Sequence, residues 1–338
     1  MTSNGPLISV IMPVHNAGFF LKEAVESILN QKNVLFELII VNDHSTDSAI
    51  NNLPQYIKKD RRIKFITSSG RGVVAAMKTG VNLSQGQYIA RMDADDITLP
   101  HRLSAQLVYL QQHPDIGIAG GQVKIISAAR VDEGFQLYEK WLNQLCQPDD
   151  INREIFIESP VPNPTAFFRR EVYEQLDGYH DPEWAEDYDI WLRAYIAGIK
   201  MAKPEGVLLH WREHKNRLTH CDKRYDNKLF MKAKAFYLSH SHHLRDRKAI
   251  IWGTGPLAIY LHDILLENNA TVDAFLEVNP KRIGGEKRGL PVYHYDAASQ
   301  YTNVLIISAV GSRGARREIR QALINMGKKE GMDFLFAA

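Results

Sequence analysis

An acidic turn at residues 93–96 places the strongest constraint on what this chain can fold into and bind. An apolar stretch, residues 88–92, runs directly into Asp93, Asp95 and Asp96. Three carboxylates this close repel one another unless a cation or hydrogen-bond donors hold them. Mg²⁺ and Mn²⁺ prefer oxygen ligands, so the turn is a candidate metal site that could in turn hold a diphosphate. The structural alternative is a solvated acidic turn that caps the next helix.

The region around this turn alternates apolar runs of strand length with amphipathic stretches of helix length. This alternation is typical of a parallel sheet with helices on both faces, and ligands of such sheets bind beyond the carboxyl ends of the strands. We therefore expect residues 13–16, 43–47 and 93–96 to meet at one edge of the sheet. The predicted strands are residues 7–12, 37–42, 63–67 and 88–92, and the predicted helices are residues 21–29 and 73–83.

A second acidic pair, Glu186 and Asp187, precedes a stretch with helical spacing. Aromatic and apolar side chains recur on one face of residues 188–195, so both acids are predicted in the first turn of a helix. The helix dipole favours acids at that position, which is a sufficient structural reason for them. The functional interpretation is that one carboxylate faces a cleft and acts as a general base.

Other stretches have less regular patterns. Residues 116–126 are predicted as one strand, and residues 128–150 show no interpretable periodicity. Residues 212–227 are polar and basic and are predicted as a surface loop, and residues 230–244 as a connecting helix. We place a domain boundary near residues 239–247, which gives one domain at 1–240 and a smaller one at 245–338.

Composition excludes several classes of protein. The 338 residues are enough for two domains with a core each, and 45% are hydrophobic and 24% charged, as in ordinary globular proteins. A net charge of +2 gives no electrostatic case for a nucleic-acid partner. Two cysteines suit a reducing compartment, and no signal-peptide pattern or membrane-spanning run is present. A cytoplasmic protein is expected, with peripheral contact at the inner face of a membrane left open.

The smaller domain restarts the strand–helix pattern. Gly253 and Gly255 form a turn between a predicted strand and a predicted helix, which is the context of a dinucleotide-binding fingerprint. The third position of that fingerprint is Ala258, and Glu277, at the end of the next strand, is the candidate partner for a ribose. A second nucleotide site and a purely structural turn are both consistent with this pattern.

Six segments occur in an order that is typical of one enzyme family. They are PVHN at 13–16, ELIIVNDHSTD at 37–47, YIARMDADD at 88–96, LPHRL at 99–103, NPTAFFRR at 163–170 and AEDYDIWLR at 185–193. Through these segments, residues 7–220 resemble the family 2 glycosyltransferases, which have the GT-A fold. The resemblance implies an α/β domain with a mostly parallel sheet, followed here by a small Rossmann-like domain. It also implies transfer of a sugar from a nucleoside diphosphate sugar, with Mn²⁺ or Mg²⁺ and with inversion at the anomeric carbon.

Transferred to this chain, the resemblance implies that Asp187 is the catalytic base and Asp95 the main metal ligand. It implies that Asp43 accepts a hydrogen bond from the nucleotide base, with uracil expected. The other implied positions are Pro13, Val14, Asn16, Arg71 and Asp93 for the donor nucleotide, and Glu186, Arg212 and His214 for contacts with substrate or diphosphate.

The chain departs from the family pattern at several points. Asn42 stands where the family often has a first aspartate, and Lys78 where an Arg or Asn is frequent. No QxxRW motif and no membrane span are present, which favours addition of one or a few sugars over processive synthesis. The expected acceptor is a hydroxyl of a glycan or of a lipid-linked molecule.

Two alternative functions stay open at this point. One is a sugar-1-phosphate nucleotidylyltransferase, although the segment after the first strand lacks the glycine-rich phosphate loop of such enzymes. The other is a non-catalytic protein that binds sugar nucleotides. The smaller domain resembles Rossmann-like sugar-nucleotide-binding domains through GTGPLA at 253–258 and GLPV at 289–292. It is expected to bind a ligand, to form a homodimer or to contact a partner enzyme.

Overall fold

The structure is a computed structural model that describes residues 5–127 and 131–338. The chain divides into two compact units, and each is described separately. The first comprises the described parts of Met1–Ile151 with Pro160–Asp181 and Gly198–Cys221, and the second Asn152–Ser159, Pro182–Ala197 and Asp222–Ala338. The boundaries at 1–240 and 245–338 stay a prediction. Residues 1–4 of the predicted first domain, and 128–130 of the stretch without periodicity, lie outside the described residues.

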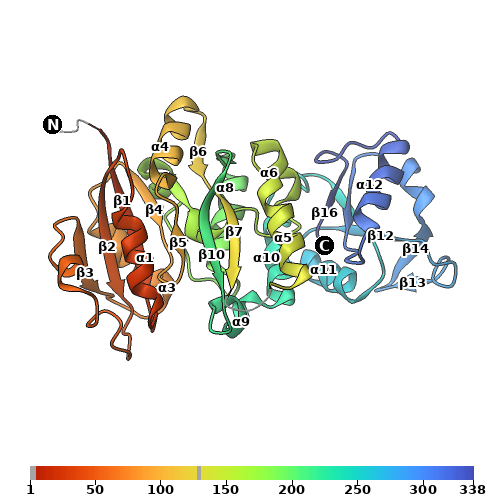
Figure 1. Cartoon of the computed structure of the whole chain (residues 1–338). Helices are drawn as coiled ribbons and strands as arrows, with labels where there is room; N and C mark the ends of the chain where they lie inside the picture. The colour runs from red at the N-terminus through yellow and green to blue at the C-terminus, as the bar shows by residue number, and fades with distance from the viewer. Residues whose placement is uncertain (1–4, 128–130) are drawn as a thin grey trace. The chain divides into compact units, whose positions relative to one another are not determined.

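The first unit is built on a mostly parallel sheet with the strand order β3-β2-β1-β4-β8-β6-β9 (Figure 1). Strands β1 to β4 run parallel, whereas β8 is antiparallel to both of its neighbours. This arrangement confirms the predicted fold class. The strands are β1 (Leu7–Val14), β2 (Leu35–Asn42), β3 (Ile63–Thr67), β4 (Tyr88–Arg91), β6 (Ile116–Ala119), β8 (Phe167–Arg169) and β9 (Lys200–Ala202).

Alternating side chains of β1 serve the two faces of this sheet. Val10 and Met12 belong to the buried cluster that includes the apolar face of α1 (Phe20–Leu29). Ile11 points the other way, toward α3 (Val73–Asn82), where a Cβ at Gly80 would lie 2.5 Å from the Ile11 side chain. Helices therefore cover both faces, as the period of two in a strand requires. The remaining helices of this part of the chain are α2 (Gln55–Lys58), α4 (Arg102–Gln112), α5 (Glu133–Gln144), α6 (Pro148–Glu154), η1 (Asn163–Thr165) and α7 (Arg170–Gln175).

The prediction of one strand over residues 116–126 is wrong. The chain forms β6 and then β7 (Gln122–Ser127), which belongs to a separate three-stranded sheet of order β5-β10-β7. Gly120 and Gly121 lie at the crossing between the sheets, where a Cβ on Gly121 would stand 3.2 Å from Leu208. The local pattern does not reveal this change of sheet, because the buried residues of β6 and the alternating burial of β7 are each consistent with a strand of one sheet.

The predicted loop at 212–227 is also wrong in part. Its first residues complete β10 (Val207–Glu213), which pairs in parallel with β7 and antiparallel with β5 (Ile97–Thr98). The short helices α9 (Leu218–Cys221) and η2 (Lys223–Tyr225) follow. Strand pairing here overrides a polar local composition, which on its own favours a loop.

The second unit contains a six-stranded sheet of order β13-β14-β12-β11-β15-β16, in which all strands but β13 are parallel. Its core joins apolar side chains of this sheet to α12, including Ile306, Phe336 and Leu323. The elements are α8 (Glu186–Ile196), α10 (Asn227–Ser239), β11 (Lys248–Trp252), α11 (Pro256–Glu267), β12 (Val272–Glu277), β13 (Glu286–Lys287), β14 (Leu290–His294), η3 (Tyr295–Gln300), β15 (Val304–Ser308), α12 (Ala315–Asn325) and β16 (Phe334–Phe336).

Helices α8 and α10 pack together around a buried carboxylate. Asp189 accepts hydrogen bonds from the Trp184 indole at 2.9 Å, the Tyr237 hydroxyl at 2.7 Å and Arg193 Nε at 2.8 Å. A buried acid needs such donors, because an uncompensated charge away from water is costly. This network explains why residues 182–197 belong to the same unit as α10 although they lie far from it in sequence.

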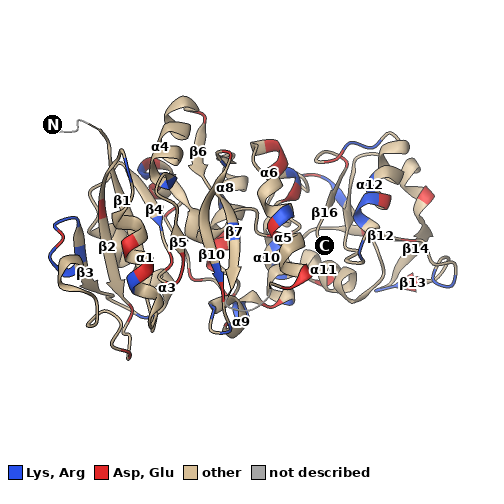
Figure 2. Ribbon diagram, viewed as in Figure 1, with Lys and Arg blue, Asp and Glu red and all other residues tan. Residues whose placement is uncertain are grey.

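Charged side chains of both signs are distributed over the elements of both units (Figure 2). This mixture agrees with the net charge of +2. Among the described residues, no helix is long and apolar enough to cross a membrane.

A buried histidine makes the second unit sensitive to acid. His243 is 3% exposed and its Nε2 lies 2.5 Å from the Tyr195 hydroxyl, while its Nδ1 has no hydrogen-bond partner among the described residues. Burial, with smaller contributions from His242 and Arg247, lowers the pKa of His243 to about 4. Between pH 6.5 and 4, His243 therefore binds a proton in the unfolded chain but stays neutral in the folded chain.

We predict that stability falls as the pH drops through this window. The contribution of His243 to the loss is about 3 kcal/mol at pH 4. Urea unfolding at pH 7 and pH 4 should show a smaller loss for His243→Gln, which cannot be protonated but still accepts from Tyr195. His294→Gln, at an exposed position of the same unit, is the control and should behave like wild type. If the free energy of unfolding falls equally in His243→Gln and wild type between pH 7 and pH 4, the assignment is contradicted.

Candidate functional site

The loops that follow β1 and β2 lock together at the carboxyl ends of these strands. The Asn16 side-chain oxygen accepts hydrogen bonds from the backbone N–H groups of Thr46 at 2.7 Å and Asp47 at 3.1 Å. His15 Nδ1 lies 2.7 Å from the backbone carbonyl oxygen of Asp43. The predicted meeting of residues 13–16 with 43–47 is thus present, and Asn16 holds the second loop in place.

Asp43 connects these loops to a third one. Its side chain is 8% exposed, and its two carboxylate oxygens lie 3.1 and 2.9 Å from the backbone N–H of Gly72, which donates to them. His44 Nε2 lies 3.1 Å from the Gly70 carbonyl oxygen, which secures the same loop. Arg71 is exposed between these two anchored glycines. Recognition of a nucleotide base by Asp43 and Arg71 stays a prediction.

The acidic turn follows β4, the neighbour of β1 in the sheet. One oxygen each from Asp93, Asp95 and Asp96 lies within 4.8 Å of the others. Arg91 Nε donates to Asp93 at 2.9 Å. Asp96 is 1% exposed, and its Oδ2 has no hydrogen-bond partner among the described residues. Burial, and then the nearby carboxylates of Asp95 and Asp93, raises the pKa of Asp96 well above its usual range.

This donor set fits a hard divalent cation. A buried carboxylate oxygen without a partner, beside two further carboxylates, is a costly arrangement for the protein alone. A divalent cation offsets that repulsion, and the ligands here are oxygens, as Mg²⁺ and Mn²⁺ prefer. The residues present therefore meet the chemical requirements of the predicted metal site.

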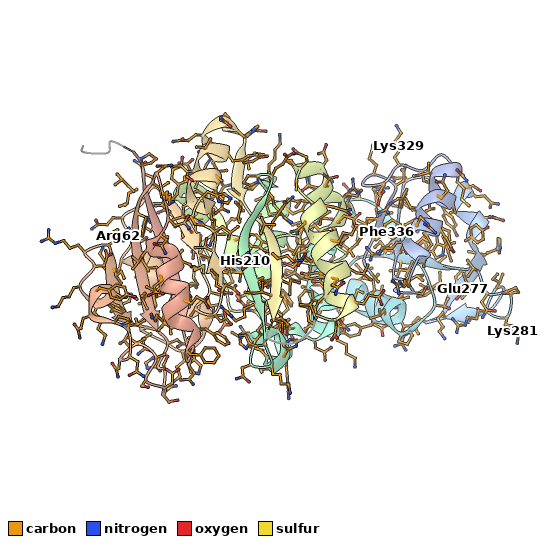
Figure 3. The ribbon with its side chains drawn as sticks, viewed as in Figure 1. Arg62, His210, Glu277, Lys281, Lys329 and Phe336 are labelled. Atoms are coloured by element: carbon orange, nitrogen blue, oxygen red, sulfur yellow. The ribbon has the colours of Figure 1, made fainter. Side chains whose placement is uncertain are left out.

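The end of strand β10 brings Arg212 and the following His214 close to the acidic turn. Because β5 follows the turn directly and pairs with β10, the end of β10 is carried back to the acids. The backbone N–H of Arg212 donates to Asp96 Oδ1 at 2.7 Å, and its Nε donates to the Asp95 carbonyl at 2.7 Å. His214 Nε2 lies 2.8 Å from Asp95 Oδ2. His210, on the same strand, is labelled in Figure 3.

The start of α1 also contributes to this cluster. The Phe20 ring stacks on His214 with 5.0 Å between ring centroids, and the Arg212 guanidinium lies 4.7 Å from the Phe20 centroid. Arg212 also donates to Glu23 at 2.6 Å. Sequence analysis missed Phe20 and Glu23, because an aromatic residue and an acid at a helix start are common and carry no separate signal.

Two buried arginines, Arg91 and Arg102, place positive charge near the acidic turn. Arg102, on α4, is fully buried and donates to the Arg91 backbone carbonyl at 2.7 Å. Burial lowers the pKa of Arg102 to about 10, although Asp93 and Asp96 act in the opposite direction. Arg91 lies with its guanidinium 5.4 Å from the Tyr179 ring centroid. Sequence analysis did not assign a role to either arginine, and a cation inside an apolar strand is the signal that could have indicated Arg91.

Glu186 and Asp187 occupy the first turn of α8, as predicted. Glu186 is 1% exposed and its Oε2 lies 3.3 Å from the Tyr225 hydroxyl. Asp187 Oδ1 accepts from the backbone N–H of Tyr188 at 2.7 Å. Both acids belong to the second unit, whereas the acidic turn belongs to the first. That Asp187 faces the acidic turn stays a prediction.

The predicted site residues are divided between the two units. The first unit contains predicted residues from five loops or strand ends, and the second contains the glycine turn and Glu277. In the first unit these are Pro13, Val14, Asn16, Asp43, Arg71, Asp93, Asp95, Arg212 and His214, and in the second Glu186, Asp187, Gly253, Gly255 and Glu277.

Comparison with known proteins finds a family model and several relatives. The model described as glycosyl transferase family 2 matches residues 9–177. An uncharacterized glycosyltransferase of Haemophilus influenzae is 31% identical over 237 residues, which is 68% of this chain and 73% of the relative. The O-antigen biosynthesis glycosyltransferase WbnJ of Escherichia coli is 31% identical over 213 residues, 62% of this chain and 80% of that protein.

Solved structures show the same fold. The crystal structure of Staphylococcus aureus TarS residues 1–349 in complex with UDP-GlcNAc matches with a TM-score of 0.56. The match covers 78% of this chain and 71% of that one at 17% sequence identity, which supports likeness of fold alone. It confirms the predicted GT-A-type architecture. The family model and the relatives confirm that the protein is a glycosyltransferase, and the chain belongs to glycosyl transferase family 2.

Proposed function

We propose that the protein is an inverting, metal-dependent glycosyltransferase that moves a sugar from a nucleoside diphosphate sugar to an acceptor hydroxyl. The observation that carries this proposal is the acidic turn, in which one buried Asp96 oxygen has no hydrogen-bond partner among the described residues, together with Arg212 and His214 beside it. An anionic cluster beside cationic side chains at the carboxyl ends of parallel strands suits a cation-bridged diphosphate.

Asp95 and Asp93 would hold Mn²⁺ or Mg²⁺, with Asp96 behind them. When bound, the cation offsets the negative charge that develops on the leaving diphosphate. His214 would orient the Asp95 carboxylate through their contact at 2.8 Å. Arg212, which is already anchored by Asp95 and Glu23, would add positive charge beside the diphosphate.

The chemistry at the sugar requires a base. The acceptor hydroxyl attacks the anomeric carbon, its oxygen forms the new glycosidic bond, and the bond to the diphosphate breaks with its electron pair leaving on phosphate. The hydroxyl proton passes to Asp187, whose carboxylate is the proposed general base. One displacement of this kind inverts the anomeric centre. Glu186, beside it on α8, would contact the sugar or the acceptor.

The nucleotide would lie along the interlocked loops after β1 and β2. Pro13, Val14 and Asn16 would line its pocket, Asp43 would accept from the base, and Arg71 would flank it. Uracil is the proposed base, and the UDP-GlcNAc complex of TarS, a protein of the same fold, is consistent with it. The name of the Escherichia coli relative supports a glycan acceptor, and a lipid-linked acceptor has the same hydroxyl chemistry.

We predict that Asp187→Asn lowers the turnover number by about 10²-fold or more, since an amide cannot accept the acceptor proton. The donor Kd should change by less than about twofold, because Asp187 is not proposed to hold the nucleotide. A thermal-shift screen of nucleotide sugars with Mn²⁺ identifies the donor, and UDP release with added acceptor measures turnover. Glu183→Gln, at an exposed acid just before α8, is the matched control. Turnover of Asp187→Asn equal to that of the control would remove Asp187 from the mechanism.

We predict that Asp95→Asn weakens Mn²⁺-dependent binding of UDP by at least about tenfold, because it removes one ligand charge from the cation. Calorimetric titration of UDP with and without MnCl₂ measures this difference. Asp115→Asn changes a surface aspartate of the same unit, which pairs with Lys200, and should titrate as wild type. A Mn²⁺-dependent gain in affinity that survives in Asp95→Asn would refute the metal assignment.

A further inference from the structure

The sheet of the second unit has the strand order of a nucleotide-binding fold. Numbered along the chain, β11, β12, β14, β15 and β16 are strands one to five, and their order in the sheet is 3-2-1-4-5. The order reverses between β11 and β15, which pair in parallel. In open parallel sheets, ligands bind at such a reversal.

A cavity of about 420 Å³ lies at this position. Its walls come from the segments that follow three strands: Gly253 and Gly255 after β11, Glu277 at the end of β12, and Gly311 after β15. This volume falls within the range of small-molecule sites in proteins. Charged side chains in its lining are Glu277, Arg282 and Glu318. All of these residues belong to the second unit.

Gly255 is not required by the fold of the chain itself. Its backbone is extended, with φ −76° and ψ 177°, a conformation that any residue adopts. A Cβ built on Gly255 would have no atom of the described residues within 4 Å, so none of them excludes a side chain there. Gly311 is similar, since its Cβ would meet only Leu257 at 3.8 Å. Two glycines that line one cavity without a local need for glycine indicate a ligand that approaches the backbone closely.

Glu277 supplies the recognition element opposite these glycines. It is 7% exposed, and its Oε1 accepts from the backbone N–H groups of Val278 at 2.8 Å and Asn279 at 3.1 Å. Burial opposes its ionisation, but these bonds and those from Thr254 and Arg282 lower its pKa below the usual value. Glu277 is therefore a rigid, ionised acceptor at the end of the second strand, where Figure 3 labels it.

Arg282 is the exposed partner in this cluster. Its guanidinium donates to Thr254 Oγ1 at 3.0 Å and to Glu277 Oε2 at 3.3 Å, and its side chain is 55% exposed. An exposed ion pair of this kind contributes little to stability. Arg282 can thus leave Glu277 Oε2 to a ligand hydroxyl and turn toward a phosphate.

We infer that this cavity binds a ribonucleoside diphosphate group, separately from the donor site of the first unit. The diphosphate lies against the backbone of Gly253 and Gly255 at the start of α11, and the ribose hydroxyls donate to Glu277. The group can be a nucleoside diphosphate, a sugar nucleotide or one half of a dinucleotide, since all of them carry this chemistry. The site is independent of the proposed transfer reaction.

The test compares the whole chain with Gly255→Val, whose side chain occupies the cavity next to the glycine turn. UDP, ADP, UDP-GlcNAc and NAD are titrated separately by calorimetry in EDTA, which removes the cation required by the proposed donor site. Gly285→Val makes the same change in the same unit outside the cavity, where a Cβ meets only the Arg282 carbonyl at 3.5 Å. Thermal melting of each variant checks that it is folded. If Gly255→Val is not folded, Gly311→Val replaces it as the cavity variant.

We expect wild type and Gly285→Val to bind at least one probe, and Gly255→Val to bind it at least about tenfold more weakly. The probe that binds most tightly identifies the source of the diphosphate. Its 2′,3′-dideoxy form should lose a similar factor on wild type, because Glu277 then has no ribose hydroxyl to accept. If the titrations of wild type and the folded cavity variant superimpose, the proposal is overturned, whether both release a heat of binding or neither does. Equal binding of the dideoxy form would overturn the role of Glu277.

Discussion

The site of the first unit depends on how a buried carboxylate is held. Asp96 is nearly inaccessible to solvent, yet only one of its oxygens has a partner among the described residues, the Arg212 backbone N–H. Such a group is costly unless positive charge is near it. Arg102 and Arg217 supply positive charge near Asp96 from within the protein, and a divalent cation would add to it from outside.

The two units follow the same topological rule but place different kinds of residue at the edge of the sheet. In each, parallel strands direct their following loops to one edge of the sheet, where polar groups and backbone N–H groups gather. The first unit uses carboxylates there, which favour a cation. The second uses glycines and one acid, which favour a diphosphate and a ribose. Family membership covers residues 9–177, so it accounts for the first edge and gives no information about the second.

Much of the fold was predictable from the sequence. The apolar strands before residue 93 have the length, the bounding turns and the intervening amphipathic helices that a parallel sheet requires. Glu186 and Asp187 were placed in the first turn of their helix because the aromatic face that follows them has helical spacing. The prediction failed at residues 116–126, where periodicity shows burial but does not show which sheet a strand joins, and at Arg212, where pairing with β7 overrode a polar composition.

The sequence alone determined which residues carry charge and which segments are strands or helices, because these properties depend on side-chain type and local spacing. It thereby determined that acids follow β4 and that glycines follow β11. Only the tertiary structure decided that His214 meets Asp95, that Phe20 lies against both His214 and Arg212, and that one oxygen of Asp96 has no partner within the described part of the chain. These contacts join residues about 120 to 195 positions apart, and such pairing is set by the packing of whole elements, which local spacing does not encode.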